Sequence, residues 1–437
     1  MRGFNTLLFV LFALSANAAD GTVGTVSVQK GNNVSVNGEA PVSLTLDGKD
    51  PQSCQFLSKR APDENHEFTW KEVTTTRGGE LAEILGDQLR SVDSLVVKGN
   101  VNDKDFHAMW DASLYGYLSV INLKNAVLEN NAVPDTAFFH ENEQYEGSSH
   151  EIFYYIGLRK IILPEGLEKI GEGAFYQASA LRQVNFPSTL RYIGDFAFNA
   201  TKLEMNQLVI PEGVEEINQY AFAFCRKLKA QVTLPSTIKK IGEWAFYGCP
   251  ITSINLPEGL ESLGSLAFWD CDLREVSIPS SCHEFNEGWQ FGFNRNLEKM
   301  HLPEGMTEIP DHFAVDCFRL REVNFPHTLK HIGEKAFSLC ISLKNVDLPL
   351  GMQSLGEEAF SELEALEQIV FPASMKSLGK NSCSYWKNIK RIYCAAIEPP
   401  VCDPTDGGVF SGFDFPDGLN TPVVYIPKGT INKYKDT

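Results

Sequence analysis

The residue types that catalyse reactions or bind metals occur in this 437-residue chain without the spacing that such sites require. His327 and His331 are four residues apart, but the first follows a proline in an expected turn, so we interpret both as surface histidines. Asp403 and Asp406 flank a turn signal that lacks the downstream glutamate of a calcium loop. No C-x-x-C pair or histidine cluster has zinc-site spacing. We therefore predict no catalytic residue, no metal site and no cofactor, and a protein that is not an enzyme.

Charged and polar residues that recur at a fixed spacing are better candidates for binding chemistry. Six of them are expected on one face: Arg274, His301, Arg321, Asn324, Lys344 and Asp347. Guanidinium, ammonium, amide and carboxylate groups in such a row could form hydrogen bonds and ion pairs with a macromolecular partner. Whether they share a face depends on the repeat in which they occur.

A proline sets the frame of that repeat. It recurs at Pro164, Pro187, Pro211, Pro235, Pro257, Pro279, Pro303, Pro326, Pro349 and Pro372. The steps between these prolines are 22 to 24 residues long. Self-similarity at a period of about 20–50 residues is the signature of a solenoid, in which each turn packs only against its neighbours.

Apolar residues stand three and one before each proline, as Val232 and Leu234 do before Pro235. Apolar residues two apart, mostly β-branched at the first position, indicate a short strand with one buried face. The proline ends that strand because it has no N–H to donate to a neighbouring strand. Residues two and four before the proline should therefore point away from the core.

A second pattern follows each proline. Six residues later comes an apolar residue such as Ile241, then usually a glycine, an acid and an Ala-Phe pair such as Ala245-Phe246. We expect the acid in the first turn of a short helical segment, where the helix dipole favours it. The acid recurs as Glu172, Asp195, Glu243, Glu287, Asp311, Glu334 and Glu357, and this recurrence argues against a catalytic carboxylate.

The consensus LxxIxLPxxLxxIgxxAFxxC, which recurs from Leu158 to about Trp386, resembles the repeats of the bacterial BspA-like leucine-rich-repeat surface-protein family. Two turns depart from it: Trp289-Gln290 stands where Ala-Phe belongs, and Phe313-Ala314 reverses the pair. The resemblance implies a leucine-rich-repeat solenoid of about ten regular turns, capped at both ends, with a parallel sheet and short helical or turn segments on the other side.

The outward-facing columns are polar and rich in amides, and a partly basic column lies five residues before the prolines. A solvated sheet face is one interpretation. A broad binding surface is the other, because solenoids commonly bind partners through their curved face. Aromatic side chains that could stack on sugar rings are missing from these columns, which argues against glycan binding there.

Ten cysteines would suggest disulfides in an exported protein. Five of them, however, lie fourteen residues after their proline: Cys225, Cys249, Cys271, Cys317 and Cys340. We expect this column to be a ladder of buried thiols. Cys394 and Cys402 lie outside the column with two prolines between them, so they are the candidate disulfide.

Residues 1–18 have the charged start, apolar core and A-x-A end of a signal peptide, and no cysteine follows at position 19 to carry a lipid. Residues 19–79 form an expected β-rich segment, with strands at Thr22–Gln29, Asn33–Val36 and Val42–Leu46. Residues 80–157 alternate helical and strand patterns and are expected to cap the regular repeats at 158–395. Residues 396–437 form the expected C-terminal cap.

The formal net charge of −18 argues against nucleic acid as a partner. We predict an exported, monomeric interaction protein, secreted or held at the cell surface or in the periplasm, without a membrane-spanning segment in the mature chain. The resemblance implies an adhesin-type role towards host extracellular matrix or other surface proteins. The alternative is a carbohydrate- or nutrient-binding surface protein, with residues 19–79 as an accessory.

Overall fold

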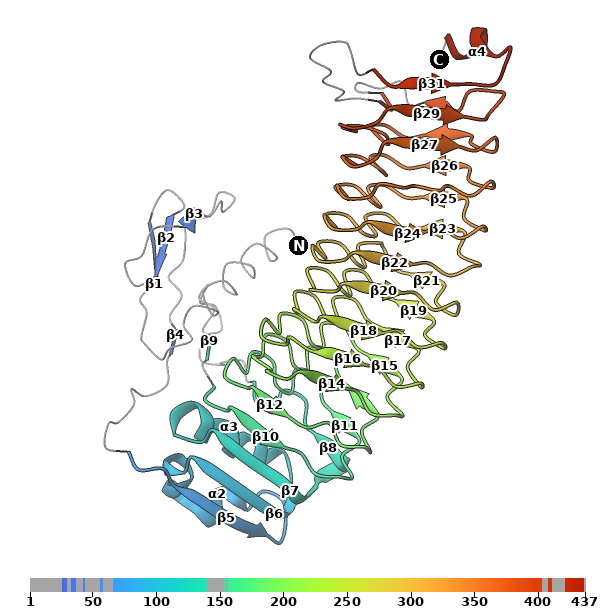
Figure 1. The fold of residues 1–437 in the computed structure, drawn as a ribbon. Coiled ribbons are helices and arrows are strands. Elements are labelled where there is room, and N and C mark those ends of the chain that lie inside the picture. The colour runs from blue at the N-terminus through green and yellow to red at the C-terminus, as the bar shows by residue number, and fades with distance from the viewer. Residues whose placement is uncertain are drawn as a thin grey trace, which may run out of the picture. The chain divides into compact units, whose positions relative to one another are not determined.

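The computed structural model describes residues 26–29, 33–36, 42–43, 56–57, 66–139, 153–154, 156–402, 408–410 and 421–435 (Figure 1). The expected signal peptide and the Asp403–Asp406 turn lie outside these residues. The chain divides into two compact units. Unit 1 comprises residues 1–190 and 196–203, and unit 2 comprises residues 191–195 and 204–437.

The N-terminal part of unit 1 contains the expected β-rich segment. Strands β1 (Val26–Gln29), β2 (Asn33–Val36) and β3 (Val42–Ser43) form an antiparallel sheet in that order. Two further short strands, β4 (Phe56–Leu57) and β9 (Phe153–Tyr154), pair in parallel.

The irregular turns of unit 1 alternate strands and helices, as the sequence predicts. The strands are β5 (Trp70–Thr75), β6 (Ser94–Val101), β7 (Val120–Leu128), β10 (Lys160–Ile162) and β12 (Gln183–Val184), which form one parallel sheet. Between them lie α2 (Leu81–Leu85), η2 (Gly86–Ser91) and α3 (Asp103–Tyr115). Because β5 already pairs with β6, the parallel sheet begins before the segment boundary expected at residue 79.

A buried carboxylate holds these first turns together. Asp105 accepts hydrogen bonds from the backbone N–H groups of Gly79, Leu81 and Asn102, at 2.7, 2.9 and 3.0 Å. Asn102 in turn caps α3 through the N–H of Lys104. Beyond η3 (Glu129–Asn131), β8 (Ala132–Val133) pairs with β11 (Lys169–Ile170), and Phe138 enters the core as the sequence predicts.

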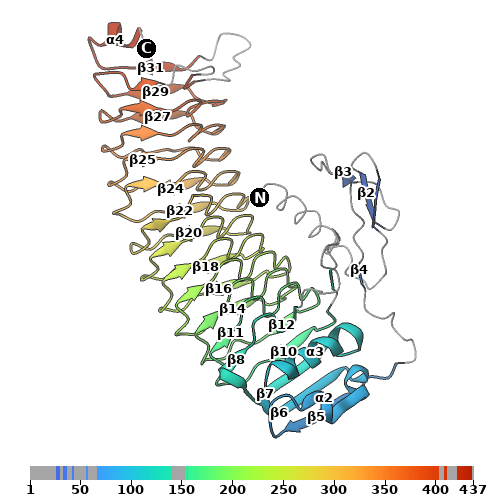
Figure 2. The same ribbon diagram turned by 180° about the vertical axis from the view of Figure 1, so that it is seen from behind.

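Unit 2 carries the predicted parallel strands just before the prolines, stacked one above another (Figures 1 and 2). They are β14 (Gln207–Val209), β16 (Gln231–Thr233), β18 (Ser253–Asn255), β20 (Glu275–Ser277), β22 (Lys299–His301), β24 (Glu322–Asn324), β27 (Gln368–Phe371), β29 (Arg391–Cys394) and β31 (Val423–Tyr425). In β16 the middle residue is buried and its two neighbours are exposed, which confirms the predicted faces. We call the outward side chains of these strands, and of the equivalent residues 345–347, the sheet face.

A second set of parallel strands, six residues after the prolines and divided between two sheets, was not predicted. Its strands in unit 2 are β13 (Tyr192–Ile193), β15 (Glu216–Ile217), β17 (Lys240–Ile241), β19 (Ser262–Leu263), β21 (Glu284–Phe285), β23 (Glu308–Ile309), β25 (His331–Ile332), β26 (Ser354–Leu355), β28 (Ser377–Leu378) and β30 (Val401–Cys402). Each strand has only two residues, so no alternation is visible in the sequence. The C-terminal helix α4 (Ile431–Lys435) follows β31.

The helical segment expected after each glycine is wrong, because the chain forms consecutive turns there. Tyr220, Phe222 and Phe224 donate their N–H groups to carbonyls of the next turn at 2.9, 2.9 and 2.7 Å, instead of to carbonyls of their own turn as in a helix. Tyr220 and Phe224 have positive φ angles of 55° and 60°. The equivalent residues of other turns also have positive φ angles. We define the turn side as the residues between the glycine column and the cysteine column, together with the few residues that follow each cysteine position.

The acids of the turn side act without a helix dipole. Asp195 and Asp311 accept hydrogen bonds from the backbone N–H groups of Gln219 and Glu334 in the next turn, at 3.0 and 2.6 Å. The glycine before the acid has a steric cause. A Cβ on Gly356 would lie 2.6 Å from the backbone nitrogen of Glu334 in the preceding turn.

Stacked phenylalanines fill the core of unit 2, as predicted. The rings of Phe222, Phe246 and Phe268 are fully buried, with centroids 5.3 and 5.5 Å apart. In the Trp289-Gln290 turn, one extra residue places Phe291 in the column, stacked 5.6 Å from Phe268. Phe313 also enters the core, but it meets Phe291 edge-on at 76°.

The cysteine column is buried and reduced, as predicted. Four of its thiols donate to carbonyls of the preceding turn, among them Cys249 to that of Phe222 at 2.9 Å and Cys271 to that of Phe246 at 3.3 Å. Burial raises the pKa of the Cys249 and Cys271 thiols well above the ordinary value, so they are poor nucleophiles. Asn294 takes the cysteine's place in the irregular turn and donates to the carbonyls of Phe268 and Phe291 at 2.7 and 2.8 Å.

Candidate functional site

Four of the six predicted partner-binding residues lie on or beside the three-stranded sheet β20–β22–β24. His301 and Asn324 are neighbours, because Ser277, His301 and Asn324 pair in register across the three strands. Arg274 and Arg321 are exposed at the starts of β20 and β24. Lys344 and Asp347 are also exposed, but residues 345–347 of their turn are not part of a strand.

Several side chains of this face are already engaged within it. His301 Nε2 lies 3.1 Å from Glu275 Oε1, and Lys299 Nζ lies 3.3 Å from Glu322 Oε2. Asn324 has a structural role, since its amide accepts from the N–H of Leu302 at 2.9 Å and donates to the carbonyl of the same residue at 3.0 Å. It thereby extends the ladder of hydrogen bonds beyond the end of the strand.

Acidic residues interrupt the predicted basic column. Glu298 stands between Arg274 and Arg321, because its N–H bonds to the Arg274 carbonyl and its carbonyl accepts from Arg321. After Lys344 comes Glu367, whose pKa lies below its ordinary value because Lys390 donates a hydrogen bond to it, with a smaller contribution from Lys344. The sheet face is therefore a mixed-charge surface.

Aromatic side chains gather on the turn side of unit 2, where the sequence analysis did not look for them. Tyr220 and Trp244 stack with ring centroids 5.3 Å apart, and Trp244 lies 4.4 Å from Tyr247. Most of these residues stand nine or twelve positions after their proline. An alignment of the residues on either side of the Ala-Phe pair would have shown this column of aromatic residues.

A second group, which we call the tryptophan cluster, consists of Trp269, Trp289, Phe293 and His312. Trp269 lies 5.2 Å from Trp289 and 4.4 Å from Phe293, and His312 stacks on Trp289 at 3.6 Å. The cluster is neither fully buried nor fully exposed. Desolvation lowers the pKa of His312, which keeps its ring neutral near physiological pH.

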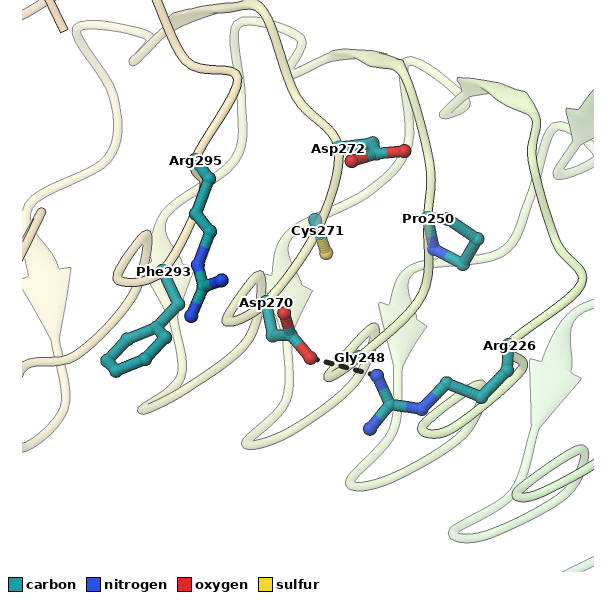
Figure 3. A pocket seen from close by; sticks show the side chains of 8 residues that line it. All are labelled: Arg226, Gly248, Pro250, Asp270, Cys271, Asp272, Phe293 and Arg295. Carbon is teal, nitrogen blue, oxygen red and sulfur yellow. Dashed lines mark hydrogen bonds and ion pairs between the residues drawn. The ribbon is translucent and has the colours of Figure 1, made fainter. Parts of the chain in front are cut away.

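A small cavity of about 180 Å³ adjoins the tryptophan cluster (Figure 3). We call it the arginine pocket. Its lining residues are Arg226, Gly248, Pro250, Asp270, Cys271, Asp272, Phe293 and Arg295. Phe293 belongs to both the pocket and the tryptophan cluster, so the two form one continuous surface.

Arg226 reaches across a whole turn to form one wall of the pocket. Its Nη1 lies 2.8 Å from Asp270 Oδ2, two turns further along the chain (Figure 3). The guanidinium passes over Gly248, where a Cβ would lie 2.9 Å from it. The absence of a side chain at this position, whose φ is +66°, leaves the space for the ion pair.

The opposite wall is formed by Arg295. Its guanidinium lies 5.6 Å from the ring centroids of both Phe293 and Phe318, so cation–π contacts hold it in place. Within the described part of the chain, no carboxylate forms an ion pair with it. Nearby, Asn296 donates to Asp272 at 3.1 Å, which fixes that carboxylate.

The candidate disulfide residues are free thiols in the structure. Cys394 Sγ accepts from the hydroxyl of Tyr434 at 3.2 Å, and Cys402 Sγ lies 3.6 Å from the carbonyl of Pro400. Pairing of the two in an oxidising compartment stays a prediction.

No three His, Cys, Asp or Glu side chains of the described part of the chain lie together in a way that could hold a metal ion. None of its helices has the length and apolar character that crossing a bilayer requires.

The two sets of parallel strands, the connecting turns and the stacked phenylalanines define a leucine-rich-repeat solenoid. Comparison with family models matches the BspA type leucine rich repeat region in six copies, at residues 148–231, 229–333 and 312–397. These matches cover more than half of the chain. The chain therefore belongs to the BspA-type leucine-rich-repeat family, which confirms the resemblance seen in its sequence.

Solved structures with similar folds come from several bacteria. A leucine-rich repeat protein from Bacteroides ovatus is 20% identical, with a TM-score of 0.44 over 86% of this chain and 94% of that one. A leucine rich cell surface protein from Faecalibacterium prausnitzii is 17% identical, with a TM-score of 0.35 over 85% and 93%. The pneumococcal vaccine antigen PcpA is 16% identical, with a TM-score of 0.34 over 94% and 95%. A search of curated proteins finds no match.

Proposed function

We propose that this protein is an exported, non-enzymatic adhesin-type protein that binds a host extracellular or other surface protein through its sheet face. The observation that carries the proposal is the register of β20, β22 and β24, which aligns exposed charged and polar side chains from successive turns. A stacked parallel sheet holds such groups in fixed positions before binding, so less conformational entropy is lost on association.

The size of the surface sets a requirement. Neighbouring strands are about 4.8 Å apart, so three strands cover only a narrow patch. A standard protein interface buries about 800 Å² on each partner. The contact must therefore extend over more turns, including Lys344 and Asp347, which are exposed in the next turn.

Export is supported by the N-terminal sequence, with Arg2 before an apolar core and Ala16-Asn17-Ala18 at its end. We expect cleavage after Ala18. Mass spectrometry of protein recovered from outside the cytoplasm should find position 19 as the first residue, and an intact Met1 there would contradict export by this route.

The binding proposal is tested with a partner captured from surface proteins by the full chain. Reversing three charges of the sheet face in Arg274→Glu/Arg321→Glu/Lys344→Glu should slow association and weaken its dependence on ionic strength. Surface plasmon resonance at two salt concentrations measures both quantities, with circular dichroism as the folding check.

A matched control reverses three lysines that stand four residues after their prolines, in Lys239→Glu/Lys330→Glu/Lys376→Glu. All three are exposed, and the net charge changes by the same amount. Equal association rates for the two triple variants would show that overall charge, and not the sheet face, controls binding.

A further inference from the structure

We propose that the arginine pocket and the tryptophan cluster together form a binding site for a saccharide that carries a carboxylate. This site lies on the turn side of unit 2 and shares no residue with the surface proposed to bind a protein partner, so it does not depend on that function. Three features of the surface carry the inference: fixed aromatic rings, fixed carboxylates and an arginine that forms no ion pair with the described residues.

The aromatic rings are the first feature. A pyranose ring has an apolar C–H face and a polar rim of hydroxyls, so it suits a site that combines flat rings with a few oriented polar groups. Trp269 is held by Trp289 and Phe293 and lies over Gly292, where a Cβ would be 2.1 Å from its ring. The indole is partly exposed and cannot collapse further into the protein.

The carboxylates are the second feature. Asp270 is oriented by Arg226, and Asp272 is oriented by Asn296. Each of these carboxylates retains oxygen lone pairs that can accept hydrogen bonds from sugar hydroxyls. Because both are fixed before binding, they impose little entropic cost on a ligand.

Arg295 is the third feature and selects the class of sugar. Its guanidinium is held against two phenyl rings and forms no ion pair with the described residues. A planar guanidinium matches a carboxylate in two parallel hydrogen bonds. The ligand's carboxylate would thus pair with Arg295, as the carboxylate of Asp270 pairs with Arg226.

The surroundings limit how much negative charge the ligand can bring. Asp270, Asp272 and Asp316 lie near the two arginines, and the whole chain carries −18. A densely anionic polymer would be repelled. The cavity of about 180 Å³ is smaller than the roughly 300–1,000 Å³ of pockets for drug-sized ligands, so it suits one sugar ring with a single charge.

The test uses the full chain and two matched pairs of probes, each with one singly charged member: sialyllactose with lactose, and galacturonic acid with galactose. Isothermal titration calorimetry should detect binding of at least one charged probe and weaker binding of its neutral partner. Arg295→Gln should weaken binding of the charged probe by about tenfold or more and leave the neutral probe unchanged. Trp269→Ala should weaken both probes.

The matched control is Arg319→Gln, which removes an exposed arginine from the next turn and should change neither affinity. Circular dichroism checks folding, and the exposed Arg295 keeps the test valid even if Trp269→Ala unfolds. The proposal is overturned if no probe binds, or if binding survives Arg295→Gln undiminished. It is also overturned if a short acidic peptide binds at this site and the saccharides do not.

Discussion

On the sheet face of unit 2, several exposed groups pair with one another, as His301 does with Glu275 and Lys299 with Glu322. On the turn side, half-buried rings stand beside Arg295, which has no ion-pair partner among the described residues. Both surfaces come from the same repeat. The difference teaches that the buried columns maintain the fold, while the chemistry of each surface is set by whether its exposed groups already satisfy one another.

The largest expected effect tests which columns are core. Phe246→Ala removes a fully buried ring that stacks on two others, and should lower the free energy of unfolding by about 3–5 kcal/mol. Gln231→Ala on the sheet face should change it by less than about 0.5 kcal/mol. Urea titrations measure both, and similar midpoints would mean that the two faces are wrongly assigned.

A smaller effect compares two asparagines. Asn294→Ala removes the side-chain donor to the buried carbonyl of Phe268 and one of the two side-chain donors to that of Phe291, and should cost about 1–3 kcal/mol. Asn324→Ala removes two bonds at the more exposed end of a sheet strand and should cost about 0.5–1.5 kcal/mol. Denaturant unfolding decides the order. A larger loss for Asn324 would show that the sheet face contributes more to stability than its exposure suggests.

The smallest effect depends on pH. Burial lowers the pKa of His312 in the folded protein, so the folded state binds its proton less readily than the unfolded state. Stability from the neutral ring is present above the unfolded pKa of about 6.5 and is lost as the pH falls towards the folded value. Between pH 7 and pH 5.5, His312→Phe should therefore lose less stability than the natural chain. An identical loss in both proteins would exclude this contribution of His312.

The first sheet, the phenylalanine column and the buried thiols could be predicted because each is a column of similar residues that recurs at a fixed distance from the proline. The second set of strands could not, since two-residue strands such as Lys240–Ile241 show no alternation. The expected helices were wrong because the N–H groups of residues such as Tyr220 bond to the next turn, a choice that no local pattern reveals.

The candidate sites show the same limit. Exposure of Arg274 and Arg321 follows from their position before the proline, but Glu298 between them alters the charge of the column. Asn324 looked like a contact residue, although its amide completes the sheet. The arginine pocket could not be foreseen, because it depends on Arg226 crossing the turn that contains Gly248.

That crossing has a consequence for how such a chain could change its length. The extra residue before Phe291 is absorbed locally and the ladder resumes at Phe313, so the stack tolerates altered turns and, we expect, duplicated ones. A duplication of the 22-residue turn from Pro235 to Pro257 would preserve every column. It would nevertheless move Asp270 beyond the reach of Arg226, because a long side chain can bridge one intervening turn but not two. Growth by a whole repeat between Arg226 and Asp270 would therefore be neutral for the scaffold and destructive for the pocket.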